Sequence, residues 1–194
     1  MVEHWQQAVG RGFSAPLRFE GSVTDCEVLG KVPAGLNGAF YRTGAEWYYP
    51  PAFKDDAILN ADGYISSFRI RNGRVDYRGQ FVRTERFLAE QAAGRQLYGY
   101  YRNPYTDDPS IRDRTIRQPN RRTVSNTAPL AHGGRLFSLK EDGLPYLADP
   151  DTLATQGTWD FHGKYRSETF SAHPKIDPLT GEMIAYGYEA TGLG

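Results

Sequence analysis

The sequence reads Tyr64-Ile-Ser-Ser-Phe-Arg-Ile-Arg71, then Asn72-Gly73, then Arg74-Val-Asp-Tyr-Arg-Gly-Gln-Phe-Val-Arg-Thr84. Apolar and polar residues alternate on both sides of the Asn-Gly pair, which is the pattern of strands with one buried face. Asn-Gly tolerates the positive φ angles of a type I′ turn, and this turn matches the twist of two antiparallel strands. The stretch therefore predicts a β-hairpin.

Two further stretches have the same strand–turn–strand form. One runs over residues 135–148, with its turn at Glu141-Asp-Gly143. The other pairs an expected strand over 168–173 with one over 183–190, across the turn Asp177-Pro-Leu-Thr-Gly181. Short strands separated by frequent turns predict a sandwich, a barrel or a propeller.

The composition also indicates an all-β chain. Gly (21) and Pro (12) suit turns, and Tyr (13) and Phe (10) suit strands. The one helix that the sequence predicts covers residues 84–95. The polar segment 103–123 carries five arginines; such a cluster can bind phosphates, but a solvated loop is the favoured interpretation because the net charge is zero.

Charge and cysteine content exclude several classes of protein. The 194 residues carry 23 basic and 23 acidic side chains, so there is no electrostatic case for binding nucleic acid or an anionic membrane. No apolar run approaches transmembrane length, and the N-terminus lacks the basic and apolar regions of a secretory signal. Cys26 is the single cysteine, which excludes an intramolecular disulfide and makes a reducing cytoplasm the expected location.

One domain is expected over residues 17–194, behind an irregular lead-in over 1–16. The chain ends at Thr191-Gly-Leu-Gly194 directly after an expected strand, which would leave an open sheet edge. The end is therefore interpreted as a truncation.

His173 is the candidate metal ligand. It closes a short apolar run, precedes the rigid Pro174 and is expected at the mouth of the third hairpin. One imidazole needs partners to hold a metal, so a buried His bonded to a carbonyl and an exposed His without a role are the alternatives. His132 and His162 are expected in loops.

A series of short motifs resembles the carotenoid cleavage oxygenases and their bacterial lignostilbene dioxygenase relatives. The resemblance extends from about Leu17 to the last residue, and its order and spacing are more specific than any single motif. The motifs are Gly30-Lys-Val-Pro-Ala-Gly-Leu-Asn-Gly-Ala-Phe-Tyr-Arg42, Asn60-Ala-Asp-Gly63, Val82-Arg-Thr-Glu85, Tyr100-Tyr-Arg-Asn-Pro-Tyr-Thr-Asp-Asp108, Asn126-Thr127, His132-Gly-Gly-Arg-Leu136, Lys140-Glu-Asp-Gly-Leu-Pro-Tyr146, Asp149-Pro-Asp-Thr-Leu153 and Ser171-Ala-His-Pro-Lys-Ile-Asp-Pro-Leu-Thr-Gly-Glu182.

The resemblance implies the N-terminal part of a seven-bladed β-propeller, with Fe(II) on the propeller axis held by four His. His173 would be the first of these ligands, and the other three would lie beyond Gly194. Glu141 matches a carboxylate that hydrogen-bonds an iron-ligating His, a contact that fixes the tautomer of the imidazole.

The lignostilbene dioxygenase branch also implies a substrate pocket. Tyr101 and Lys140 match residues that line it and are the candidate catalytic residues, with Lys140 binding the 4-hydroxyl group of a stilbene. Leu59 falls where characterised relatives have a pocket Phe, which removes an aromatic stacking surface.

The implied activity is that of a non-haem Fe(II) dioxygenase. It would cleave a C=C bond of a stilbenoid, carotenoid or apocarotenoid with O2 and give two carbonyl products. Its partners would be O2 and a small hydrophobic or phenolic alkene, and a homodimer of the full-length protein is compatible with the sequence. Two alternatives stay open: a catalytically incomplete propeller fragment and a non-catalytic β-propeller binding scaffold.

Overall fold

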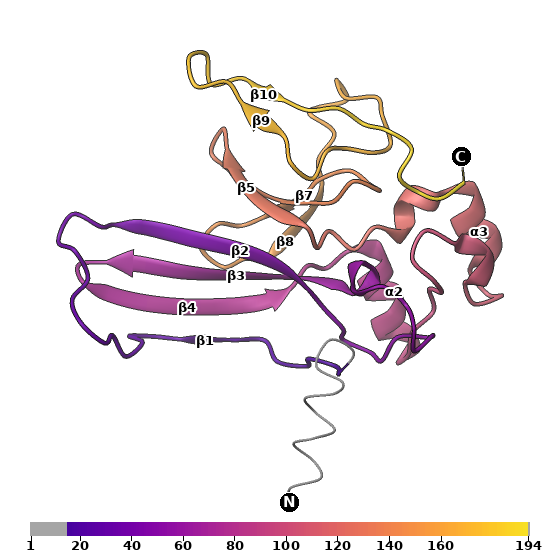
Figure 1. Cartoon of the computed structure of the whole chain (residues 1–194), viewed down its shortest axis with the longest axis horizontal. Coiled ribbons are helices and arrows are strands. Elements are labelled where there is room, and N and C mark those ends of the chain that lie inside the picture. Colours follow the sequence, from indigo (N-terminus) through magenta and orange to yellow (C-terminus); the bar gives the residue numbers. More distant parts are fainter. Residues whose placement is uncertain (1–14, 194) are drawn as a thin grey trace, which may run out of the picture.

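The computed structural model describes residues 15–193, so the lead-in predicted over 1–16 lies almost entirely outside the described residues. Two four-stranded antiparallel sheets form its centre (Figure 1). The first has the order β1-β4-β3-β2 and contains β1 (Gly21–Val23), β2 (Gly38–Glu46), β3 (Asp62–Arg71) and β4 (Arg74–Phe81). Asn72 and Gly73 have φ angles of 52° and 78°, which fit a type I′ turn. The hairpin predicted at Asn72-Gly73 is confirmed.

The second sheet has the order β5-β6-β7-β8 and contains β5 (Ala128–His132), β6 (Arg135–Leu139), β7 (Tyr146–Ala148) and β8 (Thr155–Thr158). The hairpin predicted over 135–148 is confirmed. Its second strand begins only at Tyr146, after Pro145, which has no N–H to donate to a ladder. The prediction of a loop at His132 is wrong, because His132 ends β5 opposite Arg135.

The third hairpin is present with much shorter strands than predicted. β9 (Lys175–Ile176) pairs with β10 (Met183–Ile184). The prediction of a strand over 168–173 is wrong, and the strand expected over 183–190 stops at Ile184. In the first of these segments Ser171 Oγ accepts a hydrogen bond from the N–H of His173 at 3.1 Å, and such local bonds compete with a sheet ladder.

The helix predicted over 84–95 is confirmed as α2 (Glu85–Ala93). The Oγ1 of Thr84 accepts a hydrogen bond from the N–H of Phe87 at 3.1 Å, and Gly94 follows the helix with a φ angle of 68°. Both are preferred ends of an α-helix, because they satisfy backbone groups that the helix leaves unpaired.

The prediction of a solvated loop over 103–123 is wrong. The segment forms η2 (Pro104–Thr106), α3 (Arg112–Arg117) and η3 (Pro119–Arg122). Arg122 is buried and donates to both carboxylate oxygens of Asp107, at 3.0 and 2.9 Å. A bidentate pair of this kind compensates the burial of both charges. Arg122 therefore stabilises the segment, and its guanidinium group is not available to bind a phosphate.

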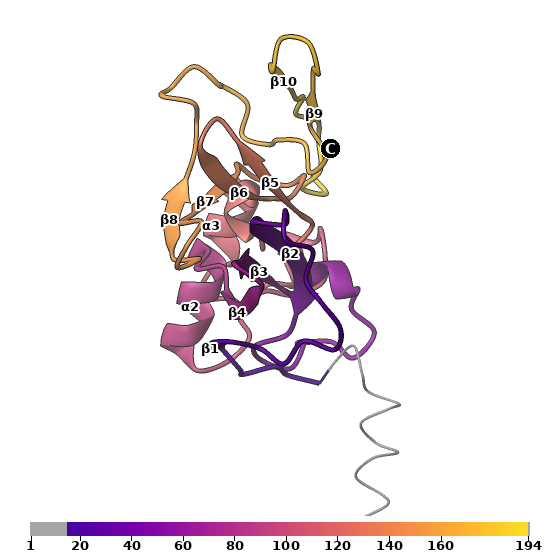
Figure 2. The ribbon, with the colours of Figure 1, turned by 90° about the vertical axis from the view of Figure 1, so that its left-hand side faces the viewer.

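The second sheet lies over one face of the first, as Figures 1 and 2 show from two directions. Side chains from both sheets and from the residues next to their strands form the core between them: Ile65, Val82, Leu136, Tyr146, Ala148 and Leu153. Sheets stacked in this way are the arrangement of neighbouring propeller blades. None of the helices within residues 15–193 is long and apolar enough to cross a bilayer.

Candidate active site

Three predicted pocket residues come from distant parts of the chain and meet at one end of the sheets. Leu59 lies in the short helix η1 (Ile58–Asn60), Tyr101 lies in the segment after α2, and Lys140 directly follows β6. Lys140 Nζ donates a hydrogen bond to the backbone oxygen of Leu59 at 3.1 Å and lies 4.9 Å from the centroid of the Tyr101 ring. A cation over an aromatic ring is attracted by the charge distribution of the ring, so the three residues form one unit.

Lys140 is a buried lysine, with only 2% of its surface exposed, which excludes the ordinary surface lysine that its strand-end position would suggest. Burial lowers the pKa of Lys140, and the nearby carboxylates of Asp142 and Glu141 oppose part of this shift. Burial also raises the pKa of Tyr101 to about 12, with the same two carboxylates adding to it. The phenol of Tyr101 is therefore neutral at ordinary pH.

The turn that carries Leu59 is tied to the segment that carries Tyr101. Asp56 Oδ1 accepts a hydrogen bond from the N–H of Tyr101 at 2.9 Å. Asn60 Nδ2 donates to the backbone oxygen of Gly99 at 2.7 Å. Because both bonds cross between the two segments, neither segment can shift without the other.

Asn126 is a site residue that sequence reasoning missed. Its Nδ2 donates to the backbone oxygens of Leu59 at 3.0 Å and Ala61 at 2.7 Å, and its Oδ1 accepts from Lys140 Nζ at 3.2 Å. The signal in the sequence was its place in the Asn126-Thr127 motif, which carries no information on what the amide touches.

A buried group of charges lies next to the η1 turn, and sequence reasoning missed it too. Arg86, Glu90 and Asp62 are each at most 2% exposed, and Arg86 donates to Asn60 Oδ1 at 2.6 Å. Burial, and then the neighbouring Glu90, raises the pKa of Asp62, while Arg86 opposes the shift. The group is thus joined to the turn through the side chain of Asn60.

His173 and Glu141 are the two residues that the resemblance connects with a metal ion. His173 is exposed, and within residues 15–193 no hydrogen bond joins its side chain to Glu141. In the same part of the chain no three His, Cys, Asp or Glu side chains lie close enough to hold a metal ion. The roles of His173 as a metal ligand and of Glu141 as a contact of an imidazole ligand both stay predictions.

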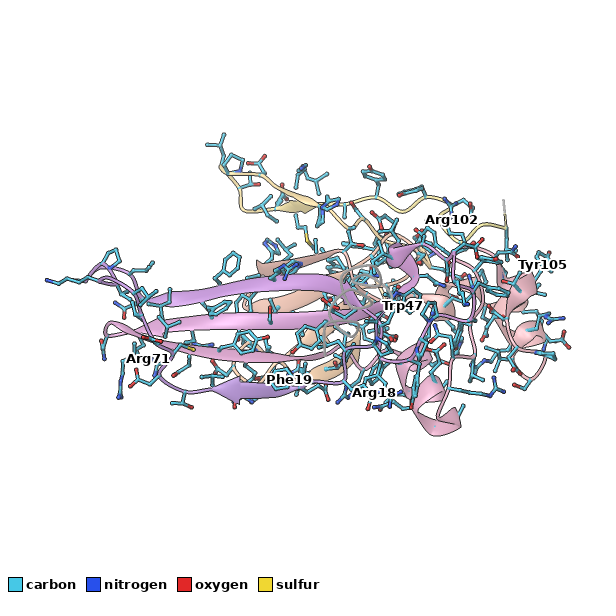
Figure 3. The ribbon with its side chains drawn as sticks, turned by 60° about the horizontal axis from the view of Figure 1, so that its bottom comes forward. Arg18, Phe19, Trp47, Arg71, Arg102 and Tyr105 are labelled. Carbon is cyan, nitrogen blue, oxygen red and sulfur yellow. The ribbon has the colours of Figure 1, made fainter. Side chains whose placement is uncertain are left out.

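The C-terminal segment lies along the rim of this end of the molecule. Arg102, the residue after Tyr101, forms an ion pair with Glu189 at 3.0 Å, and Figure 3 shows Arg102 beside the C-terminal trace. Trp47, which Figure 3 also labels, lies in the interior and is 2% exposed. The Tyr101 segment is thus joined both to η1 and to the last residues of the chain.

Comparison with known protein families gives a match over residues 14–193 to the family described as RPE65, retinal pigment epithelial membrane protein. Resveratrol cleavage oxygenase 1 of Chaetomium globosum is 49% identical over 179 residues, which are 92% of this chain and 29% of that relative. Lignostilbene-alpha,beta-dioxygenase isozyme III of Sphingomonas paucimobilis is 44% identical over 182 residues, 94% of this chain and 36% of that relative.

A solved structure is similar in the same region. The crystal structure of Pseudomonas brassicacearum lignostilbene dioxygenase superposes with a TM-score of 0.82 at 42% identity, and the match covers 91% of this chain and 35% of that one. The chain therefore spans about a third of the length of the relatives it matches.

Proposed function

The chain belongs to the RPE65 family of carotenoid cleavage oxygenases, and we propose that it serves the oxidative cleavage of a C=C bond in a phenolic stilbene. The reaction consumes the alkene and O2 and releases two aldehydes. Each carbon of the former double bond gains one of the two oxygen atoms of O2. Relatives named as resveratrol and lignostilbene oxygenases favour a stilbenoid over a carotenoid substrate.

The observation that carries this proposal is the buried ammonium group of Lys140, held over the ring of Tyr101. A buried cation next to an aromatic ring is suited to a substrate that has an oxygen atom on an aromatic ring. A positive charge beside a phenolic oxygen favours its phenolate form. The phenolate donates electron density into the conjugated alkene, which makes the double bond a better reaction partner for an oxidant.

His173 would hold Fe(II) together with imidazoles from outside these 194 residues, and when bound the metal supplies the redox chemistry with O2. Tyr101 and the aliphatic side chain of Leu59 would cover the substrate ring and keep water from it. The carboxylate of Glu141 would accept a hydrogen bond from the second ring nitrogen of an imidazole ligand and so orient that ligand.

The alternative is that the 194-residue chain by itself is catalytically incomplete. It is supported by the exposure of the His173 imidazole and by the lack of any metal-binding group of three side chains within residues 15–193. A chain of this kind would bind no stoichiometric iron, whereas a full-length protein would.

The experiment that tests the proposal compares two substrates in the full-length protein. Lys140→Met, which keeps the length of the side chain but not its charge, should lower kcat/KM for 4-hydroxystilbene about 10- to 150-fold, because a charge-assisted hydrogen bond is worth roughly 1.5–3 kcal/mol. The loss for 4-methylstilbene should be small, because this substrate cannot use the ammonium group.

Lys164→Met is the matched control, since Lys164 is exposed, and it should change neither rate. Equal losses for the two substrates in Lys140→Met would show that Lys140 does not bind the hydroxyl group, and the stilbenoid assignment would then be wrong.

A further inference from the structure

The orientation of the Asn126 amide follows from its neighbours. The backbone oxygens of Leu59 and Ala61, at 3.0 and 2.7 Å, lie next to one end of the amide. Carbonyl oxygens only accept hydrogen bonds, so the NH2 group must occupy this end. A flipped amide would leave three buried oxygens facing one another without a donor, which costs several times the worth of one hydrogen bond.

The amide oxygen therefore faces Lys140. Lys140 Nζ donates to Asn126 Oδ1 at 3.2 Å and to the backbone oxygen of Leu59 at 3.1 Å. An ammonium group has three N–H bonds, and within residues 15–193 no third hydrogen-bond acceptor of this group is found. One hydrogen of Lys140 is left over, and the centroid of the Tyr101 ring lies 4.9 Å from Nζ.

We infer that Asn126 is a positioning residue that determines substrate specificity, because Asn126 and the backbone oxygen of Leu59 each accept one hydrogen of Lys140 and together leave a single one for an oxygen atom of the substrate. The inference rests on the proposed function. The same amide donates to the backbone oxygens of Leu59 and Ala61, so one side chain fixes the ammonium group and the turn next to it.

Without Asn126 the ammonium group keeps only the Leu59 oxygen and can rotate about the Cε–Nζ bond. The substrate oxygen then competes for hydrogens whose directions are no longer fixed. The preference for a hydroxylated over a non-hydroxylated substrate falls, while a substrate that does not touch Lys140 is affected only through the general packing of the pocket.

The test is the ratio of kcat/KM for 4-hydroxystilbene to that for 4-methylstilbene, measured in the full-length protein. Asn126→Ala should lower this ratio roughly 2- to 12-fold, the equivalent of one ordinary hydrogen bond. In a Lys140→Met background the same change should leave the ratio unaltered, because the two residues act through one hydrogen bond.

Ser138→Ala is the matched control. Ser138 is as buried as Asn126, and its Oγ donates to the backbone oxygen of Ser125 at 2.7 Å without touching Lys140. It should lower the rates for both substrates alike and leave the ratio unchanged. Asn126→Asp is a second variant of nearly the same shape; its carboxylate would neutralise the ammonium group, so the ratio should fall in this variant as well.

The outcomes separate the two proposals. If Lys140→Met leaves the ratio unchanged, the proposed function is wrong. If Lys140→Met lowers the ratio but Asn126→Ala and Asn126→Asp do not, the positioning role of Asn126 is wrong. The same holds if the effects of Asn126→Ala and Lys140→Met on the ratio multiply in the double variant. Either result leaves the proposed function untouched.

Discussion

Leu59 has an aliphatic side chain that is 48% exposed, and its backbone oxygen accepts a hydrogen bond from Lys140. The family resemblance leads one to expect Phe at this position. Leu59→Phe should restore a stacking surface for an aromatic substrate, and aromatic pairs contribute roughly 0.5–1.5 kcal/mol beyond the area they bury. We expect the KM for 4-hydroxystilbene to fall about 2- to 12-fold in the full-length protein, with little change in kcat.

Leu88→Phe is the control for this substitution, because Leu88 is equally exposed on α2. An unchanged or higher KM in Leu59→Phe would mean that the side chain of residue 59 does not contact the substrate ring.

At the scale of single residues, the sequence predicted which side chains belong together but not how they are held. Lys140, Tyr101 and Leu59 were named from resemblance to known motifs. The burial of Lys140 depends on the oxygen of Leu59, which is 81 residues away in the chain, and on Asn126, which is 14 residues away. No local pattern encodes such contacts.

At the scale of the elements, α2 depends on its N-terminal cap. Thr84 is buried and its Oγ1 accepts the N–H of Phe87. Thr84→Ala should lower the free energy of unfolding by about 1 kcal/mol, the usual cost of losing such a cap, as measured by urea denaturation. Thr24→Ala, at an exposed position after β1, should change the free energy by much less; similar losses in the two variants would contradict the capping role.

The elements that the sequence predicted correctly are those with local signals. Asn72-Gly73 and Thr84 each specify a turn or a helix start within a few residues. The strand β2 and the helix α3 went unrecognised, because β2 is defined by its pairing with the distant β3 and α3 by the ion pairs of its segment, such as Arg122 with Asp107. The strand expected over 168–173 failed for the opposite reason: local Ser and Thr bonds replaced a partner strand.

At the scale of the whole molecule, the buried charges Asp62, Arg86 and Glu90 make stability depend on pH. The pKa of Asp62 is raised from 3.8 to about 7, chiefly by burial. Between these two values the folded protein binds a proton that the unfolded chain has lost, so the free energy of unfolding should fall as the pH rises from about 4 to about 7. The slope contributed by one such group is at most about 1.4 kcal/mol per pH unit.

Asp62→Asn should flatten this slope, because an amide does not titrate. Urea denaturation between pH 4 and pH 8 measures it, and Asp113→Asn, at an exposed position of α3, is the control that should leave the slope as it is. A slope that survives in Asp62→Asn would assign the pH dependence to another group.

We propose that His173 provides a metal ligand of an alkene-cleaving oxygenase, and the iron content of the purified full-length protein tests this proposal most directly. Elemental analysis should find stoichiometric iron in the wild type and in His162→Ala, which removes another exposed imidazole. In His173→Ala the iron content should fall at least about tenfold, since loss of a direct ligand costs more than the 10- to 100-fold loss of affinity typical of outer contacts. Undiminished iron in His173→Ala, or a wild-type protein that binds none, would contradict the account.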